Sequence, residues 1–377
     1  MNDLLTYCEK HLDDTVAAIE TLVRLESPST DKAAVDRCGA VLADLLRAAG
    51  GEVQVLPQAG SGDHLCARFH GPGPPVMLLG HFDTVWPLGT LARMPLRRDG
   101  DRLHGPGVFD MKAGIAIAIA AVKALRATRG SPAVTMVWTA DEEVGSVTSR
   151  GIVETEAGQA AAVLVLEPAL PGGALKTARK GCGEFELIVR GLAAHAGLDP
   201  GKGASAIHEL AAQILGIEKL QDLSRGISVN VGLISGGSRA NVVAEEARAT
   251  IDVRAPTRET AEAVEAGLRA LHPGRQGTRL TLRGGFERPP MERTAAVAGL
   301  FARASFVASC LGRELSEGSA GGGSDGNFTA AAGVPTLDGL GPIGDGAHAA
   351  HEHVVISALP WRVALLAGLL DTFRSPA

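Results

Sequence analysis

The chain has 377 residues, which is enough for two domains with sizeable cores. Its formal charge is −6, from 36 Lys and Arg against 42 Asp and Glu, and this balance argues against nucleic acid as the main partner. The most apolar stretch, around Gly114 to Leu125, is short and is bounded by Lys112 before it and Lys123 near its end. It predicts a buried helix and gives no reason to expect a membrane partner.

The features that bear on the cellular compartment favour the cytoplasm. The first residues, Met1 to Leu5, lack the basic segment and the apolar core of a signal peptide. The five cysteines are odd in number and none has a C-x-x-C spacing, which argues against a disulfide framework. We therefore expect a protein of the reducing cytoplasm.

The first half of the chain alternates between helical and extended patterns. Apolar spacing predicts a helix from about Leu4 to Leu22, and the capping cluster at 29–31 begins a second helix that ends at Gly50. Further runs predict strands at 52–56, 64–70, 75–79, 134–138 and 161–166, with a helix from 111 to about 126. Strands that alternate with helices in this way predict a doubly wound α/β domain.

The pattern changes after Glu167, where the segment 168–173 predicts a boundary. The next residues predict the order strand, helix, strand, strand, helix, strand of a ferredoxin-like (βαββαβ) layer. The six elements are at 184–190, 205–220, 227–235, 246–254, 260–271 and 278–283. Helices at 294–311 and 357–373, with a strand at 334–337, then restore the α/β pattern. We therefore expect a catalytic domain of residues 1–177 and 288–377, with residues 178–287 inserted in it.

Acidic and imidazole side chains follow three of the predicted buried strands at the point where each strand ends. A fourth place is the glycine-rich turn at 105–107, which brings an aspartate to the start of a helix. The ligand site of an open α/β sheet lies at the carboxyl ends of its strands, so these side chains should converge. They are His81, Asp83, Asp110, Asp141, Glu142, Glu143 and Glu167.

The three adjacent carboxylates at 141–143 need a partner if they are buried, because like charges raise one another's pKa and unpaired buried charge is costly. A solvated acidic turn is the alternative for this run taken alone. A bound cation would explain why acidic or imidazole side chains occur at all four of these places. Because the donors are nitrogen and oxygen without thiolate, they favour zinc, cobalt or manganese over an iron–sulfur cluster.

These motifs resemble, in the same order, those of the M20 metallopeptidase family and in particular its glutamate carboxypeptidase branch. The resemblance covers essentially the whole chain. Each motif alone is weakly specific, whereas eight in order are strongly so. They are Gly80–Val85, Gly107–Lys112, Asp141–Ser146, Glu167–Pro168, Ala194–Gly197, Asn241 with Arg254, Gly323–Asp325 and Ala347–His348.

The resemblance implies two zinc ions per subunit, with cobalt or manganese as substitutes. Asp110 would bridge the two ions. His81 and Glu167 would complete one site, and Glu143 and His348 would complete the other. The alternatives that need no metal are a hydrogen-bonded core histidine at position 81 and a simple helix cap at position 110.

Two more carboxylates are implied in catalysis. Glu142 would be the general base that moves the proton of the attacking water. Asp83 would orient His81 through the imidazole nitrogen that does not face the metal. An exchange of roles between Glu142 and Glu143 is the alternative.

Two details of this centre concern neighbouring residues. His351 and His353 lie close to His348, and the family usually has Asp or Asn where this chain has His351, so a shift of the ligand is the alternative there. The resemblance also implies that the peptide bond between Asp110 and Met111 is cis, although no proline is present.

The implied substrate contacts lie in the inserted domain and in a glycine-rich patch. His195 would stabilise the oxyanion in the active site of the other subunit of a homodimer. Asn241 and Arg254 would hold the free carboxylate of the substrate, since a guanidinium matches a carboxylate bidentately. A surface histidine and a surface salt bridge are the alternatives for His195 and Arg254. Gly323 and Ser324 would belong to a substrate-binding loop, because no Lys-Ser/Thr follows to make a phosphate cradle.

The sequence therefore predicts a dinuclear zinc-dependent hydrolase that cleaves an amide or peptide bond next to a free carboxylate, as a glutamate carboxypeptidase-type exopeptidase does. An N-acyl amino acid deacylase or a dipeptidase on the same scaffold is the enzymatic alternative. A metal-stabilised dimer without catalysis is the third hypothesis, and it would require loss of the base that Glu142 supplies. The inserted domain would serve as a lid and as the dimerisation domain.

Overall fold

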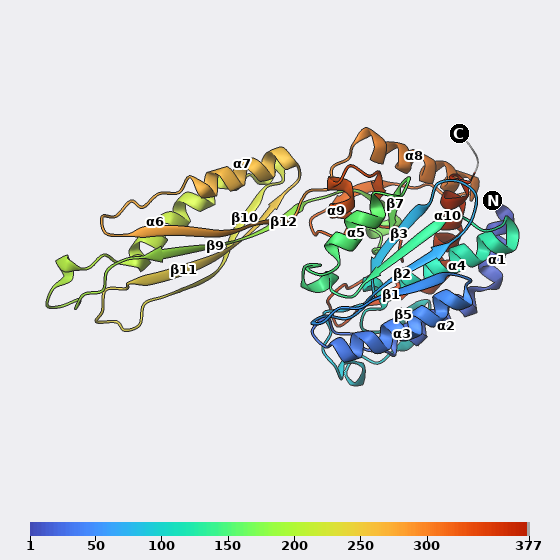
Figure 1. Cartoon of the computed structure of the whole chain (residues 1–377), viewed down its shortest axis with the longest axis horizontal. Helices are drawn as coiled ribbons and strands as arrows, with labels where there is room; N and C mark the ends of the chain where they lie inside the picture. The colour runs from blue at the N-terminus through green and yellow to red at the C-terminus, as the bar shows by residue number, and fades with distance from the viewer. Residues whose placement is uncertain (375–377) are drawn as a thin grey trace. The chain divides into compact units, whose positions relative to one another are not determined.

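The computed structural model describes residues 1–374 and divides into two compact units (Figure 1). The large unit contains Met1–Thr177, Arg293–Ala320 and the chain from Ser324 onward, and the small unit contains Ala178–Glu292 with Gly321–Gly323. The mixed α/β fold expected from the sequence is confirmed. The small unit runs to Glu292, whereas the sequence placed the boundary at 287.

A six-stranded sheet forms the centre of the large unit. Its order is β1-β2-β6-β3-β7-β14, antiparallel from β1 to β6 and parallel from β6 onward. Every residue of β3 and β6 is buried, which explains why both segments are continuous apolar runs in the sequence. The strands are β1 (Glu52–Leu56), β2 (His64–Phe69), β3 (Val76–His81), β6 (Val134–Thr139), β7 (Val163–Val165) and β14 (Thr336–Leu337).

Helices cover both faces of this sheet. On one face Leu78 packs into the core formed by the N-terminal helices, α4 and α10, and on the other Met77 and Leu79 pack against α5. The helices are α1 (Asn2–Lys10), α2 (Leu12–Val23), α3 (Lys32–Ala48), α4 (Ala113–Thr128), α5 (Arg150–Ala157), α8 (Ala295–Cys310), α9 (Gly326–Ala331) and α10 (Leu359–Asp371). None of the helices within residues 1–374 combines the length and the apolar character needed to cross a bilayer.

Two predictions for the large unit were incomplete. The single helix expected from Leu4 to Leu22 is broken at His11, whose backbone leaves the helical region at φ −105° and ψ 23°. Two small sheets were missed because their strands are too short to show a periodic pattern. These are β15-β16-β5-β4 and β13-β8, with β4 (Arg97–Asp99), β5 (Arg102–His104), β8 (Leu175–Arg179), β13 (Glu317–Ala320), β15 (Gly344–Asp345) and β16 (His353–Val355).

The small unit has the predicted ferredoxin-like order of elements. Its sheet runs β10-β11-β9-β12 with all neighbours antiparallel. Alternate residues of β9 and β11, such as Phe185 and Ile251, pack with Leu210 and Val264 of the two helices in one core. The elements are β9 (Gly181–Arg190), α6 (Ala206–Ile217), β10 (Ser228–Gly236), β11 (Glu246–Ala255), α7 (Arg258–Arg269) and β12 (Arg279–Arg288).

Candidate metal centre

His81, Asp110 and Glu167 form a first group of candidate metal ligands. His81 is the last residue of β3, Glu167 follows β7, and Asp110 lies in the turn before α4. Nε2 of His81 is 3.3 Å from Oδ1 of Asp110 and 3.4 Å from Oε1 of Glu167. The convergence follows from the topology, because β3 and β7 pair in parallel and their carboxyl ends meet at one edge of the sheet.

Asp110, Glu143 and His348 form a second group. Nε2 of His348 is 3.3 Å from Oδ2 of Asp110 and 3.2 Å from Oε2 of Glu143. In each group the candidate donor atoms all lie within 4.8 Å of one another. Asp110 belongs to both groups and turns one oxygen to each imidazole, which is the arrangement of a bridging carboxylate.

The geometry and the chemistry of the donors fit two cations. Ligands about 2.0–2.1 Å from a tetrahedral zinc ion lie about 3.3 Å from one another. The four imidazole–carboxylate distances above are 3.2–3.4 Å. In addition, Oε1 of Glu143 is buried and has no hydrogen-bond partner among residues 1–374. A buried oxygen without a donor is costly, so a cation beside it is a physical explanation for its burial.

The charges of this cluster perturb one another strongly. Hydrogen bonds to Asp110 and Glu143 raise the pKa of His348 to about 10. Burial would lower the pKa of His81, but hydrogen bonds to carboxylates, Asp110 first, raise it well above its ordinary value. Burial raises the pKa of Glu143, whereas for Asp110 the two imidazoles outweigh burial and lower the pKa. The carboxylates thus favour the charged form of both imidazoles, and a metal ion held there would compete with their protons.

Asp83 connects the first group to the acidic turn after β6. Its side chain is fully buried. Nδ1 of His81 is 3.1 Å from the main-chain oxygen of Asp83 and 3.4 Å from its Oδ1. The same carboxylate accepts the amides of Glu142 at 3.3 Å and Glu143 at 3.2 Å, and the hydroxyl of Ser29 at 2.6 Å. One buried group thus fixes the imidazole of His81 and the backbone of both glutamates. Glu142 itself is half-buried.

The other two histidines of the 348–353 segment belong to neither group of candidate ligands. The side chain of His351 is 65% exposed and lies 3.9 Å from Asp345. His353 hydrogen bonds to the main-chain oxygen of His351 and packs beside the ring of His104, with centroids 5.2 Å apart. Of the three histidines in this segment, His348 is therefore the one that lies next to Asp110.

Glu352 is a feature of the site that the sequence did not reveal. Its side chain is fully buried and accepts four N–H groups, three of them from the backbone of the turn that carries Asp110. Burial raises its pKa to about 6. In the sequence, a glutamate between two histidines is most simply interpreted as a surface residue. Its N–H partners can be identified only in the folded structure. The peptide bond between Asp110 and Met111 is cis, as expected.

His195 and Asn241 lie together in the small unit. The amide of Ala196 donates to the main-chain oxygen of Asn241 at 3.0 Å, and both side chains are exposed. Nδ1 of His195 accepts the amides of Gly197 and Leu198, each at 3.1 Å. In the neutral imidazole the proton must therefore be on Nε2, which leaves Nε2 as a donor.

Arg254 lies at the opposite end of the same sheet. It pairs in register with Cys182 at the start of β9, whereas the loop with His195 follows the end of that strand at Arg190. The stretch from Cys182 to Arg190 spans about 26 Å at the usual rise of about 3.3 Å per strand residue. The guanidinium is half-buried and pairs with Asp252, at 2.6 Å between Nη2 and Oδ2.

Hydrogen bonds hold the glycine-rich patch in place at Gly322, Gly323 and Ser324. The oxygens of Gly322 and Gly323 accept hydrogen bonds from Arg179 at 3.1 and 3.0 Å. Ser324 is fully buried and its hydroxyl donates to Oδ2 of Asp338 at 2.7 Å. The Ser324 side chain therefore faces Asp338 rather than an open pocket, while Gly323 is only half-buried.

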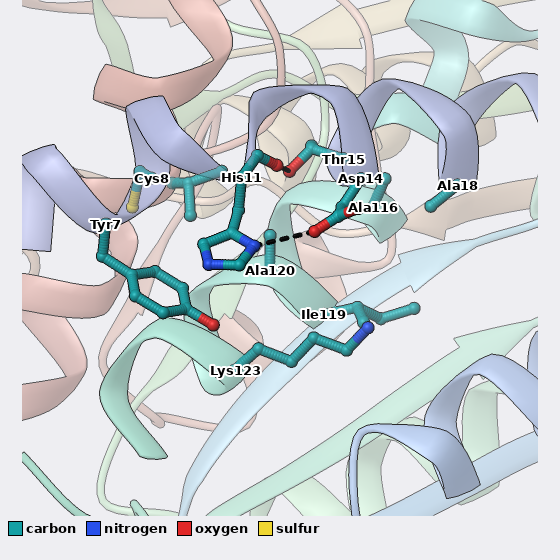
Figure 2. Close-up of a pocket in the computed structure, with 11 residues that line it drawn as sticks. Tyr7, Cys8, His11, Asp14, Thr15, Ala18, Ala116, Ile119, Ala120 and Lys123 are labelled. Carbon is teal, nitrogen blue, oxygen red and sulfur yellow. Dashed lines mark hydrogen bonds and ion pairs between the residues drawn. The ribbon is translucent and has the colours of Figure 1, made fainter. Parts of the chain in front are cut away.

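A separate cavity of about 270 Å³ lies between α1, α2 and α4 (Figure 2). None of the candidate metal ligands lines it. Its polar side chains largely pair with one another: Nδ1 of His11 is 2.7 Å from Asp14, and the ring of Tyr7 stacks on His11 at 4.3 Å. Figure 2 shows Lys123 extending along the floor beside Ile119. We assign no ligand to this cavity.

Comparisons with known proteins agree with the geometry. The profile of Peptidase family M20/M25/M40 matches residues 77–372. Carboxypeptidase G2 of Pseudomonas sp. (strain RS-16) is 29% identical over 371 residues, which cover 94% of this chain and 88% of that protein. Succinyl-diaminopimelate desuccinylase of Leptothrix cholodnii is 31% identical over 379 residues, with 92% and 95% covered.

A solved structure shows the same fold. Aminopeptidase PepT from Bacillus cereus superposes with a TM-score of 0.82 over 97% of this chain and 99% of that one, at 22% sequence identity. The family match extends over most of the chain and includes all five candidate ligands. The chain therefore belongs to Peptidase family M20/M25/M40 and is a hydrolase of the metallo-exopeptidase and amidohydrolase type.

Proposed function

We propose that this enzyme is a dinuclear zinc-dependent hydrolase that cleaves an amide or peptide bond next to a free carboxylate. The observation that carries the proposal is the position of Asp110, whose two oxygens face the imidazoles of His81 and His348 at 3.3 Å each. Glu167 and Glu143 complete the two groups. Cobalt and manganese prefer similar nitrogen and oxygen donors and are the alternative metals.

The roles of the residues follow from this centre. Two cations held there supply charge that polarises the scissile carbonyl and lowers the pKa of the attacking water. Glu142 is the proposed general base, which takes the proton of that water and passes it to the leaving nitrogen. Its backbone is held by Asp83, and its neighbour Glu143 is turned toward His348. Asp83 keeps the imidazole of His81 in position, because that ring needs an acceptor for Nδ1–H when Nε2 faces a metal.

His195, Asn241 and Arg254 are proposed to contact the substrate. The exposed Nε2–H of His195 suits donation to an oxygen that becomes negative in the transition state. Arg254 suits a free carboxylate, although it would have to share or release Asp252. Gly323, with its half-buried backbone, remains the candidate in the glycine-rich loop, and Ser324 would hold that loop through Asp338.

A homodimer resolves a conflict between these assignments. Because His195 and Arg254 lie at opposite ends of one sheet, a substrate of amino-acid size cannot touch both residues of the same copy. Two copies can supply one residue each. The edge strand β10 offers a surface for this pairing, since it carries exposed Leu233 and Ile234, and α6 beside it carries exposed Leu215. An apolar, unpaired edge strand favours pairing with another chain.

The relatives support two of the candidate substrate classes, and a dipeptidase remains the further alternative. The whole-length likeness to a carboxypeptidase favours release of a C-terminal residue such as glutamate. The likeness to a desuccinylase favours the alternative, removal of an acyl group from an amino acid. Both reactions place the scissile amide near a free carboxylate.

We also propose a cytoplasmic location, because the five cysteines are free thiols.

A hydrolysis panel tests the proposal. Folate-like acyl-glutamates, N-acyl and N-succinyl amino acids and dipeptides should be incubated with enzyme that has been loaded with zinc, cobalt or manganese. We expect hydrolysis only of compounds with a free carboxylate next to the amide, and a loss of rate of at least about 10²-fold when that carboxylate is methylated, as for a lost charge-assisted bidentate contact. Equal rates for the methyl esters would contradict the role of Arg254.

A further inference from the structure

The buried carboxylate of Glu352 contacts the backbone of the predicted bridging ligand Asp110 and of two residues just before it. Oε1 accepts the amides of Phe109 at 2.9 Å and Asp110 at 3.0 Å. Oε2 accepts the amide of Gly107 at 2.9 Å and the indole N–H of Trp86 at 2.8 Å. The side chain is fully buried, and all four partners are N–H donors. Each carboxylate oxygen thus accepts two hydrogen bonds. A glutamine, which has the same shape but only one oxygen, cannot accept all four.

Glu352 also lies in the compact turn that carries the predicted ligand His348. The amide of Ala349 donates to Gly346 at 2.8 Å, and the amide of Glu352 donates to Ala349 at 3.0 Å. Gly346 and His348 both have positive φ, at 86° and 60°. A Cβ at Gly346 would come within 2.9 Å of the backbone of Glu352, so the two backbone segments of this turn are closely packed. Glu352 and His348 are therefore connected through one hydrogen-bonded turn.

We propose that Glu352 is a positioning residue that sets the separation between Asp110 and His348 and thereby the affinity of the second metal site. The inference rests on the proposed function. Glu352 holds the turn of one ligand and is part of the turn of the other. The first site depends on it less, because His81 is held by β3 and by Asp83, and Glu167 follows β7.

The substitution that tests this role is Glu352→Gln. The amide has the shape of the carboxylate, but its NH2 group must oppose either the two donors at Oε1 or the two at Oε2. We expect the second zinc ion to bind about 10–100-fold more weakly, the usual effect of losing a group that orients a ligand, with a smaller effect on the first zinc ion. The readout is zinc bound per subunit at buffered free-zinc concentrations, together with the absorption spectrum of the cobalt-substituted protein.

Glu209 provides a matched control in the small unit. It is also fully buried, and it accepts the amides of Gly274 at 2.9 Å and Arg275 at 2.8 Å and the side-chain amide of Gln213. Glu209→Gln should lower the unfolding temperature of the zinc-free protein and leave zinc binding unchanged. Equal weakening of zinc in both variants would show that general destabilisation is the cause, and it would overturn the inference.

Other outcomes are equally decisive. Two zinc ions bound to folded Glu352→Gln with wild-type affinity would overturn the inference and leave the proposed function intact. Failure of the wild-type protein to bind two zinc ions would overturn the proposed function itself. If Glu352→Gln does not fold, Trp86→Phe removes only the indole donor at Oε2. A weaker second zinc ion in that variant supports the inference, and an unchanged affinity overturns it.

Discussion

Replacement of Asp83 by asparagine tests how the site is held together. Oδ2 accepts the Ser29 hydroxyl and the Glu143 amide, and Oδ1 accepts the Glu142 amide. In Asp83→Asn one oxygen becomes an NH2 group. The hydroxyl of Ser29 can rotate and accept from it, but an amide cannot. Whichever way the asparagine turns, the amide of either Glu142 or Glu143 loses its acceptor.

The cost of Asp83→Asn follows from that count. One buried amide without an acceptor costs about 1–3 kcal/mol in the free energy of unfolding. The same change loosens His81 and Glu143, so zinc affinity or activity should fall by about 10–100-fold. Denaturant unfolding of the zinc-free protein measures the first quantity, and hydrolysis of an acyl-glutamate at saturating zinc measures the second.

Asp141 supplies the matched control. It is 2% exposed, and Oδ2 accepts both the amide and the hydroxyl of Thr148 at 2.7 Å. Its Oδ1 is buried without a hydrogen-bond partner in the described chain. Asp141→Asn can therefore keep both bonds and exchanges one buried atom without a partner for another, so we expect a net change within about 1 kcal/mol. Equal effects of the two substitutions, or none for Asp83→Asn, would refute the reasoning.

Three further predictions concern the general base, the protonation of His348 and the sharing of a site between subunits. Glu142→Gln should keep both metals while turnover falls by about 10²–10⁴-fold. Glu143→Gln should instead lose one metal ion or bind it more weakly. Analysis of metal content checks this, and equal metal loss in both variants would mean that the roles are misassigned. In the metal-free protein the pKa of His348 is raised to about 10. The protonated ring therefore stabilises the folded state fully at pH values below the pKa of a histidine in the unfolded chain. This stabilisation is lost as the pH rises through about 10. Zinc binding at pH 7 should therefore release protons, so its calorimetric heat should depend on the buffer, and a heat independent of buffer would contradict this. Finally, mixing Glu142→Gln with His195→Ala subunits should restore about a quarter of wild-type activity, since half of randomly paired dimers are mixed and each holds one intact site of two. No recovery despite proven subunit exchange would exclude a shared site.

The strand ends were predictable because two signals coincide there. A continuous apolar run predicts a buried parallel strand, and a sudden carboxylate or imidazole marks its carboxyl end. This placed His81, Glu143 and Glu167 at one edge of the sheet. The ferredoxin-like order of the small unit was predictable for the same reason, since its strands alternate and its helices have one apolar face.

Contacts that depend on exact turn geometry were not predictable. Glu352 acquires its role only when the backbone amides of Gly107, Phe109 and Asp110 turn toward it. The burial of Ser324 depends on Asp338, which no pattern links to it. The pairing of Arg254 with Asp252 could have been found, because residues two apart on a strand lie on the same face.

Zinc titration into the metal-free enzyme tests the central claim most directly, with hydrolysis of an acyl-glutamate and bound metal followed in the same samples. If Asp110 joins two cations to form the catalytic centre, the verified metal-free protein should be inactive. Activity should then rise to its full value as two zinc ions bind per subunit. Full activity in a sample shown to contain no divalent metal, or binding of two zinc ions without any hydrolysis across the substrate panel, would contradict the account.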